Sequence, residues 1–188
     1  MLANDDVCKA ILIKKIQPHL KKGQIVIDMS STTQNTALEI GKALKKKKAF
    51  FLDAPVSGGT IGAEKGTLAI MVGGDKKIFN TVMPLFKSMG TAIYVGKTGC
   101  GQVAKLANQT IVGISIGAVS EALILAEAAG ADPKAVREIM LHGFAGGPIL
   151  RNHGLRILTK NFKPGGKVST QLKDMNNIIA TAKKYKLN

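Results

Sequence analysis

The chain has 188 residues, of which 45% are hydrophobic and 21% are charged, so it can bury the core of a soluble globular protein. Its formal net charge of +15 comes mostly from scattered lysines, with three arginines and no interleaved aromatic residues. This pattern favours a solvated surface over a nucleic-acid interface. The two cysteines and the segment "MLANDD", which lacks the features of a secretory signal, indicate a reducing, cytoplasmic location without a disulfide framework.

The first half of the chain alternates between helical and extended patterns. Helical periodicity is found at 6–22, 34–46 and 75–90. Short apolar runs predict strands at 24–32, 49–56, 68–74 and 91–96. Asp75 is suited to cap the third helix, and the glycine-rich segment after the second strand is expected to be a loop. Strands that alternate with helices predict a parallel, doubly wound sheet.

The second half of the chain is helical. Residues 101–129 are compatible with one long helix, Asp-Pro at 132–133 predicts the start of another, and a last helix is expected from about Ser169. The apolar stretch 111–130 approaches the length of a membrane span. Because glutamates occur in its second half, we expect a buried core helix and no membrane. We therefore predict an α/β domain at 1–98 and an all-α domain at 99–188.

A single lysine stands in the otherwise uncharged segment "GCGQVAKLANQ" (99–109). Lys105, Asn108 and Gln109 are spaced i, i+3 and i+4, so they share one face of the predicted helix. Burial of an unpaired ammonium group is costly, and Lys105 must therefore reach solvent, a partner or a ligand. The two amides beside it favour a pocket for an oxygen-rich ligand. A lysine that simply extends to the surface is the alternative.

The segment "DAPVSGG" (53–59) follows a predicted buried strand, which is where open α/β sheets bind ligands. The consecutive N–H groups of Ser57, Gly58 and Gly59 could form a nest for a carboxylate or phosphate. A glycine-rich turn that binds nothing is the alternative. The chain contains no G-x-G-x-x-G dinucleotide fingerprint.

Histidine and cysteine do not predict a catalytic centre. His19, His142 and His153 are far apart in the sequence and lack metal-ligand spacing, so no metal site is expected. Cys100 stands at a predicted helix N-terminus, which could activate its thiol, but no histidine or aspartate partner is near it in sequence.

These motifs together resemble the β-hydroxyacid dehydrogenase family. "DAPVSGG" is similar to the family's substrate-binding segment, "GTLAIMVGGD" to the strand after it, and "GCGQVAKLANQ" to its catalytic segment. "NFKPGGK" and "QLKDM" are similar to later motifs on the cofactor side, and "KLANQ" and "GFAGGPIL" are most similar to the tartronate semialdehyde reductase branch. The resemblance implies the C-terminal half of a Rossmann-type doubly wound sheet, followed by an all-α domain for dimerisation and substrate binding that starts with a long helix.

The resemblance also implies an enzyme that uses NADP or NAD to reduce a small semialdehyde carboxylate to the hydroxy acid. Lys105 would exchange a proton with the substrate oxygen. The implied substrate-binding residues are Ser57, Gly58, Gly59, Asn108 and Gln109. The implied cofactor-binding residues are Met1, Leu2, Ser31, Thr32, Phe162, Lys173 and Asp174. A homo-oligomer is expected, with a small carboxylate as its substrate.

The sequence departs from the family pattern in three places. The βαβ unit with the glycine fingerprint and the last helices of family members have no counterpart here, so we expect a fragment that binds NAD(P) poorly on its own. In addition, Ala3 replaces the proline of the family's "MLP" segment. A 3-hydroxyisobutyrate dehydrogenase is the alternative within the family, although such enzymes usually carry Asn at the last position of the K-x-x-x-N pattern, where this sequence has Gln109, with Asn at 108. A non-catalytic module for binding or dimerisation, for which the basic charge is the argument, is the alternative outside it. The choice between NAD and NADP stays open.

Overall fold

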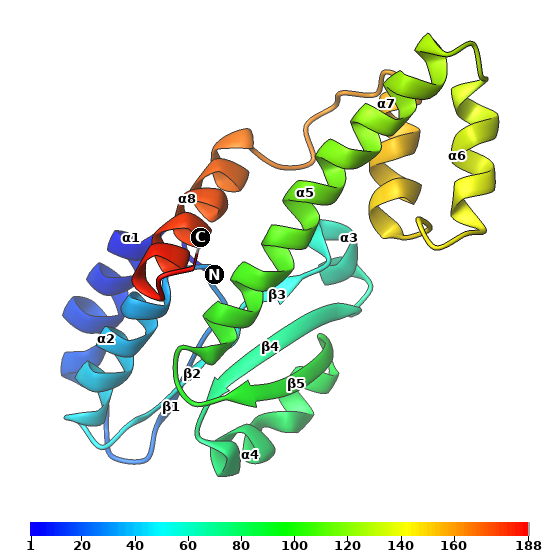
Figure 1. The fold of residues 1–188 in the computed structure, drawn as a ribbon. Coiled ribbons are helices and arrows are strands. Elements are labelled where there is room, and N and C mark those ends of the chain that lie inside the picture. Colours follow the sequence, from blue (N-terminus) through cyan, green and yellow to red (C-terminus); the bar gives the residue numbers. More distant parts are fainter. Residues whose placement is uncertain (188) are drawn as a thin grey trace. The chain divides into compact units, whose positions relative to one another are not determined.

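The computed structural model describes residues 1–187 and consists of two compact units (Figure 1). Unit 1 comprises residues 1–107 together with the segment from Asn177 onward, and unit 2 comprises residues 108–176. The division between the compact units falls inside a helix. It does not test the predicted division into functional domains at residues 98 and 99.

Unit 1 contains the sheet and the helices that pack on it. Its helical segments before the long helix are α1 (Asp5–Lys9), η1 (Ala10–Ile16), η2 (Gln17–His19), α2 (Gln34–Lys45), α3 (Gly59–Glu64) and α4 (Lys76–Lys87). Its strands are β1 (Ile25–Asp28), β2 (Phe50–Asp53), β3 (Val56–Ser57), β4 (Leu68–Gly74) and β5 (Gly90–Gly96). The predicted helices and strands are confirmed, and Asp75 caps α4 by accepting the N–H groups of Lys77 and Ile78.

The glycine-rich segment after the second strand was predicted to be a loop, and this is wrong because α3 forms there. Gly58 has φ 134° and Gly59 has φ 63°. Glycine adopts such positive φ values without a steric penalty, so the chain can turn from β3 directly into a helix.

The sheet is mixed, so the prediction of a parallel sheet is wrong. β1 pairs with β2 and β4 pairs with β5 in parallel, but β4 runs antiparallel to both β2 and β3. β2 and β3 pair with β4 in the same antiparallel register, and only a short break at Pro55 separates the two strands. The carbonyl of Pro55 accepts the N–H of Met71 across this break. The connection from β3 to β4 contains only the short helix α3. A parallel return requires a crossover of a dozen or more residues, so this short connection favours the antiparallel pairing.

Helices cover both faces of this sheet, as predicted. One apolar cluster joins Phe51 to Ile40 and other residues of α1, η1 and α2, and a second cluster joins Leu52 to Phe79 in α4. Successive strand residues point to opposite faces, so α1 and α2 lie on one face and α4 lies on the other (Figure 1).

The remaining helices follow β5. The long helix α5 (Cys100–Ala128) starts in unit 1 and continues into unit 2, where α6 (Pro133–Leu141), η3 (Leu150–Gly154), α7 (Leu155–Leu158) and the start of α8 (Val168–Lys184) follow. Asp132 caps α6 as predicted. The C-terminal end of α8 belongs to unit 1. There, Lys184 donates to Asn35 Oδ1 at 2.8 Å, and the Tyr185 hydroxyl donates to Gln34 Oε1 at 2.7 Å.

The prediction that α5 is a buried core helix is wrong. Its apolar side chains at Ile111, Ile114, Ile124 and Leu125 are exposed, and 11% of its most apolar 18-residue window is buried. Among the described residues, α5 is the one helix whose length and composition would allow it to cross a membrane. Its apolar residues occur around most of its circumference, and residues 1–187 cover only part of that surface.

Candidate functional site

Buried polar side chains on α5 define the candidate site. Gln102, Lys105 and Gln109 are 0%, 8% and 9% exposed, whereas Ile111 and Ile114 on the same helix are 67% exposed. The spacing i, i+3 and i+7 places the three polar residues on one helical face. A surface helix normally buries its apolar face and exposes its polar one, whereas this part of α5 buries these polar side chains beside Leu106 and exposes isoleucines. The buried polar face therefore has a role other than apolar packing.

Asp53, at the end of β2, fixes the first turn of α5. Its Oδ1 accepts the N–H of Gly99 at 2.8 Å, and its Oδ2 accepts the N–H of Gln102 at 3.0 Å. These donors belong to a helix N-terminus, which has no intrahelical acceptors for them and favours a negative charge. Burial raises the pKa of Asp53 to about 6, and the hydrogen bonds from the backbone amides oppose that rise. At neutral pH the carboxylate is therefore ionised and anchors the helix.

Two glycines allow α5 to approach Asp53 this closely. A Cβ atom on Gly101 would lie 2.6 Å from the carbonyl oxygen of Met71 and closer still to that of Asp53. A Cβ atom on Gly73 would lie 2.7 Å from Asp53 Oδ1. Real side chains do not make such contacts. The second glycine of the G-x-G pair at 99–101 therefore serves close packing against β2 and β4.

Gln102 connects this turn of α5 to the segment that follows β1. Its Oε1 accepts the N–H of Thr32 at 2.9 Å, and its Nε2 donates to the carbonyl of Ser30 at 2.8 Å. Thr32, Ser30 and Gln102 are all buried, so the loss of either bond would leave a polar group unpaired away from water. Asp53 and Gln102 together hold α5, β2 and the segment after β1 in one arrangement.

The N-terminal residues lie beside the same segment. The N–H of Leu2 donates to Ser30 Oγ at 2.7 Å, and the side chain of Met1 is exposed. The structure therefore brings Met1 and Leu2 next to the segment with Ser31 and Thr32. These are the four residues of unit 1 for which a cofactor role was predicted.

The predicted anion nest lies between β3 and α3. Ser57 pairs with Ala69 of β4, and Gly58 packs against Leu68. A Cβ atom on Gly59 would meet no atom within 4 Å, so the backbone borders open space at this position. The role of these residues in binding an anion stays a prediction.

In unit 2 the structure joins four of the predicted site residues. Gln109 Nε2 donates to Asp174 Oδ2 at 2.8 Å, and Asn108 Nδ2 donates to Gln109 Oε1 at 2.9 Å. The Lys173 Nζ lies 3.3 Å from Asp174 Oδ1. Asp174 is buried, and its carboxylate orients Gln109. Phe162, by contrast, is exposed and borders a pocket of about 220 Å³ within unit 2.

Sequence reasoning missed Asp53 and Gln102. Each has a local signal, since Asp53 is the only charged residue of the predicted strand at 49–56 and Gln102 lies in the apolar first turn of a helix. Their partners, however, are 46 to 72 residues away in the sequence.

Burial raises the pKa of the Cys8 thiol, which disfavours a reactive thiolate there. Among residues 1–187, no group of three or more His, Cys, Asp or Glu side chains is arranged to hold a metal ion.

Two family models match the chain in succession. Residues 1–99 match the NAD binding domain of 6-phosphogluconate dehydrogenase, and residues 99–188 match the NAD-binding domain of NADP-dependent 3-hydroxyisobutyrate dehydrogenase. The 2-hydroxy-3-oxopropionate reductase of Escherichia coli is 46% identical over 89% of this chain and 58% of its own length. The probable 3-hydroxyisobutyrate dehydrogenase-like 1 protein of Arabidopsis thaliana is 40% identical over 83% of this chain and 47% of its own length. The chain thus spans about half the length of these curated relatives.

Solved structures are similar over the whole chain. The 3-hydroxyisobutyrate dehydrogenase of Salmonella typhimurium has a TM-score of 0.88 at 25% identity, and the chain covers 66% of it. The Mycobacterium tuberculosis 3-hydroxyisobutyrate dehydrogenase with L-serine has a TM-score of 0.89 at 25% identity, and the chain covers 67% of it. These similarities confirm the predicted fold class, a Rossmann-type sheet followed by helices.

Proposed function

Since the chain belongs to the β-hydroxyacid dehydrogenase family, we propose that it forms part of an oxidoreductase that reduces a small semialdehyde carboxylate to the hydroxy acid with NADP or NAD. The burial of Lys105 on the polar face of α5 carries this proposal. The similarity to the E. coli 2-hydroxy-3-oxopropionate reductase supports a substrate of the tartronate semialdehyde type. The similarity to 3-hydroxyisobutyrate dehydrogenases supports 3-hydroxyisobutyrate and its semialdehyde as the second candidate pair.

Lys105 is the proposed acid and base. The nicotinamide cofactor, when bound, supplies or accepts the hydride at the substrate carbon. In the reductive direction the Lys105 ammonium group donates a hydrogen bond to the carbonyl oxygen and transfers its proton to that oxygen as negative charge develops there. In the oxidative direction the neutral amine takes the proton back. Asp53 and Gln102 hold the preceding turn of α5, so the ammonium group is presented in one position.

The proposed substrate contacts lie on both sides of this lysine in the sequence. Ser57, Gly58 and Gly59 would hold the carboxylate through backbone N–H groups and the serine hydroxyl, and the open space at Gly59 supports this role. Asn108 and Gln109 would orient the substrate. The hydrogen bond from Gln109 to Asp174 supports this, because it fixes the amide in one orientation.

The residues of this chain fit part of a nicotinamide dinucleotide. The segment after β1 offers hydroxyl groups beside the exposed Met1, which suits the carboxamide of the nicotinamide end. We assign Met1, Leu2, Ser31 and Thr32 to that end. Because Thr32 is buried and its N–H is bonded to Gln102, it would act by fixing the backbone of this segment. The pyrophosphate would need a glycine-rich turn at a helix N-terminus, and the sequence contains no G-x-G-x-x-G.

The helical part of the chain would contribute further contacts to the cofactor. We assign Phe162 and Lys173 to this role. Asp174 would act indirectly, since its carboxylate already holds Gln109 and Lys173. The exposed ring of Phe162 supports a contact with a flat cofactor ring.

Three further proposals concern the organisation of the protein. The exposed isoleucines of α5 support a homo-oligomer, because an apolar surface of this kind is normally covered by a partner. The meeting point of the two family models at residue 99 supports functional domains at 1–98 and 99–188. We also retain the cytoplasmic location as a proposal, which the sequence composition supports.

The reaction is tested by the oxidation of NADPH or NADH in the presence of tartronate semialdehyde or 3-hydroxyisobutyrate semialdehyde. Cofactor is supplied at millimolar concentration, because a chain without the fingerprint is expected to bind it weakly. Lys105→Met should lower kcat by about 10²–10⁴-fold, since it removes the proton donor and retains a side chain of similar length. Lys97→Met, which changes an exposed lysine, is the matched control and should retain turnover. Equal turnover of the Lys105→Met variant and the unmodified chain would contradict the proposal, as would no reduction of either substrate.

A further inference from the structure

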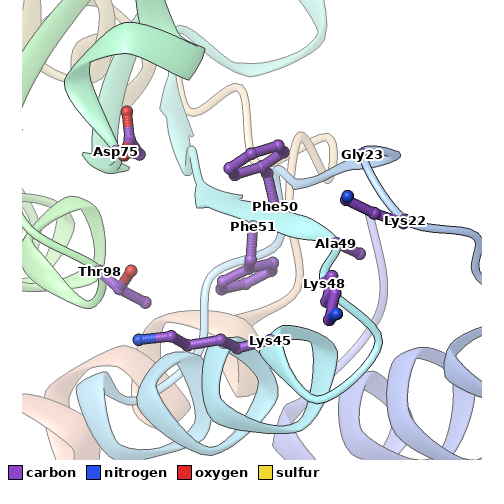
Figure 2. Close-up of a pocket in the computed structure, with 10 residues that line it drawn as sticks. Lys22, Gly23, Lys45, Lys48, Ala49, Phe50, Phe51, Asp75 and Thr98 are labelled. Carbon is purple, nitrogen blue, oxygen red and sulfur yellow. The ribbon is translucent and has the colours of Figure 1, made fainter.

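A cavity of about 570 Å³ lies in unit 1 at the amino ends of β1 and β2 (Figure 2). The proposed site residues Ser31, Thr32 and Ser57 follow the carboxyl ends of the same strands. Because β1 and β2 are parallel, the cavity and the proposed redox site lie at opposite ends of these strands. The cavity is therefore a separate feature of the fold.

Phe50 and Phe51 of β2 form the apolar floor of the cavity. They border it because β4 pairs with only the second half of β2. β4 pairs with Leu52 and Asp53, so Phe50 and Phe51 have no strand beside them on that edge among the described residues. The Phe51 ring is buried against α2, whereas the Phe50 ring is exposed and points to the other side of the strand (Figure 2). Aromatic rings at an open strand edge suit contact with another flat apolar group.

Three lysines surround this floor. Lys22 precedes β1, Lys45 ends α2, and Lys48 lies in the turn after α2. Figure 2 shows Lys45 extending below Phe51 toward Thr98. Within residues 1–187, none of the three ammonium groups forms an ion pair with a carboxylate. The acidic residue of the lining, Asp75, caps α4.

We propose that this cavity binds a small organic anion in which a flat aromatic group carries a phosphate, sulfonate or carboxylate. The aromatic group would lie along the open edge of β2 against the exposed ring of Phe50, and the anionic group would lie near Lys45 and Lys48. The volume falls within the range of roughly 300–1,000 Å³ that small-molecule sites occupy. The excess of positive charge selects an anion, and the apolar floor selects against a simple hydrated ion. This proposal does not depend on the proposed reaction.

The test uses 1-naphthyl phosphate as a fluorescent probe, because the chain contains no tryptophan to interfere with naphthalene emission. Binding is measured by fluorescence anisotropy. Inorganic phosphate and 1-naphthol serve as competitors, and each should displace the probe at least 10-fold less well than unlabelled phenyl phosphate does. Inorganic phosphate has the anionic group without the aromatic group, and 1-naphthol has the aromatic group without the anionic group. Displacement by inorganic phosphate as effective as that by phenyl phosphate would overturn the apolar part of the proposal.

Variants locate the probe. Lys45→Gln combined with Lys48→Gln should weaken binding at least 10-fold, and Phe50→Ala should weaken it several-fold. Lys14→Gln combined with Lys15→Gln removes the same charge from exposed positions in η1 and should change binding less than twofold. Circular dichroism establishes that each variant folds, and Phe50→Leu replaces Phe50→Ala if the latter does not.

Two further results would overturn the proposal. Equal weakening by the two lysine pairs would show binding through net charge alone. Probe binding that NADPH abolishes but that the Lys45→Gln and Lys48→Gln changes leave unaltered would place the probe in the redox site. Neither result bears on whether Lys105 is the proton donor, so failure of this proposal is distinguishable from failure of the proposed function.

Discussion

The two ends of β1 and β2 are built in contrasting ways. At the carboxyl ends, Asp53 and Gln102 are buried, and their polar atoms are bonded to backbone groups. At the amino ends, Lys22, Lys45 and Lys48 are exposed and surround a floor of aromatic rings. Buried hydrogen-bonded networks hold one geometry, whereas exposed lysines adopt many rotamers at little cost. The first arrangement suits a reaction that needs a fixed proton donor, and the second suits recognition of ligands that vary in shape.

Disruption of the close packing of α5 against the carboxyl end of β2 should have the largest effect on the free energy of unfolding. Gly101→Ala would force a Cβ atom against the carbonyl oxygens of Asp53 and Met71, so we expect the free energy of unfolding to fall by about 3 kcal/mol or more. Gly117→Ala on the same helix is the matched control, because a Cβ atom there meets nothing within 4 Å. It should stabilise the chain by about 0.5–1 kcal/mol through helix propensity. Urea unfolding measures both variants. A Gly101→Ala variant as stable as Gly117→Ala would show that this contact is not tight.

The pH dependence of stability tests the buried charge at the same end. The pKa of Asp53 is about 6 in the folded chain and 3.8 for an ordinary aspartate. The folded state binds this proton more tightly, so Asp53 favours folding below about pH 4, and this contribution is lost as the pH rises to about 6. A difference of about two pKa units corresponds to up to about 3 kcal/mol.

Asp53→Asn removes this titration. Its free energy of unfolding, measured by urea denaturation from pH 4 to pH 7, should lack the fall that we expect of the unmodified chain between pH 4 and pH 6. Asp6→Asn, at an exposed position in α1, is the control and should retain the fall. Parallel pH profiles for the Asp53→Asn variant and the unmodified chain would contradict the assignment.

The smallest effect is expected at the amino end, where Asp75 both caps α4 and lines the cavity. Asp75→Asn retains a capping side chain, so stability should change by less than about 0.5 kcal/mol. The loss of negative charge should tighten 1-naphthyl phosphate binding by about two- to threefold. Asp132→Asn makes the same change at the cap of α6 and should leave binding unaltered. Weaker binding by the Asp75→Asn variant would indicate that Asp75 is itself a ligand contact.

The parts of the fold that depend on residues close together in the sequence could be predicted from the sequence. The caps at Asp75 and Asp132 act on N–H groups two or three residues away, and both were predicted. The direction of β4 could not be predicted, because a strand pattern does not specify which neighbour the strand pairs with. The exposure of α5 could not be predicted either, since an apolar helix has the same sequence pattern whether it is covered or not.

The candidate site likewise contains residues that the sequence predicts and residues that it does not. Lys105 stands out in the sequence because it is the only charge in an apolar segment, and its burial is consistent with a role in binding or chemistry. Asp53 and Gln102 do not stand out, because their partners at Gly99, Ser30 and Thr32 become neighbours only after the sheet and α5 have formed. Residues that hold a reactive group in place act across long sequence separations, so they are harder to find than the reactive group itself.

The return of α8 to unit 1 has a consequence for biosynthesis. Unit 1 is discontinuous, and residues 108–176 are inserted between its two parts. Tyr185 and Lys184 bond to Gln34 and Asn35 in α2, about 150 residues earlier in the chain. A ribosome therefore releases the sheet and all of unit 2 before it releases the segment that completes unit 1. The contacts of Gln34 and Asn35 with α8 therefore form only after unit 2 has been synthesised.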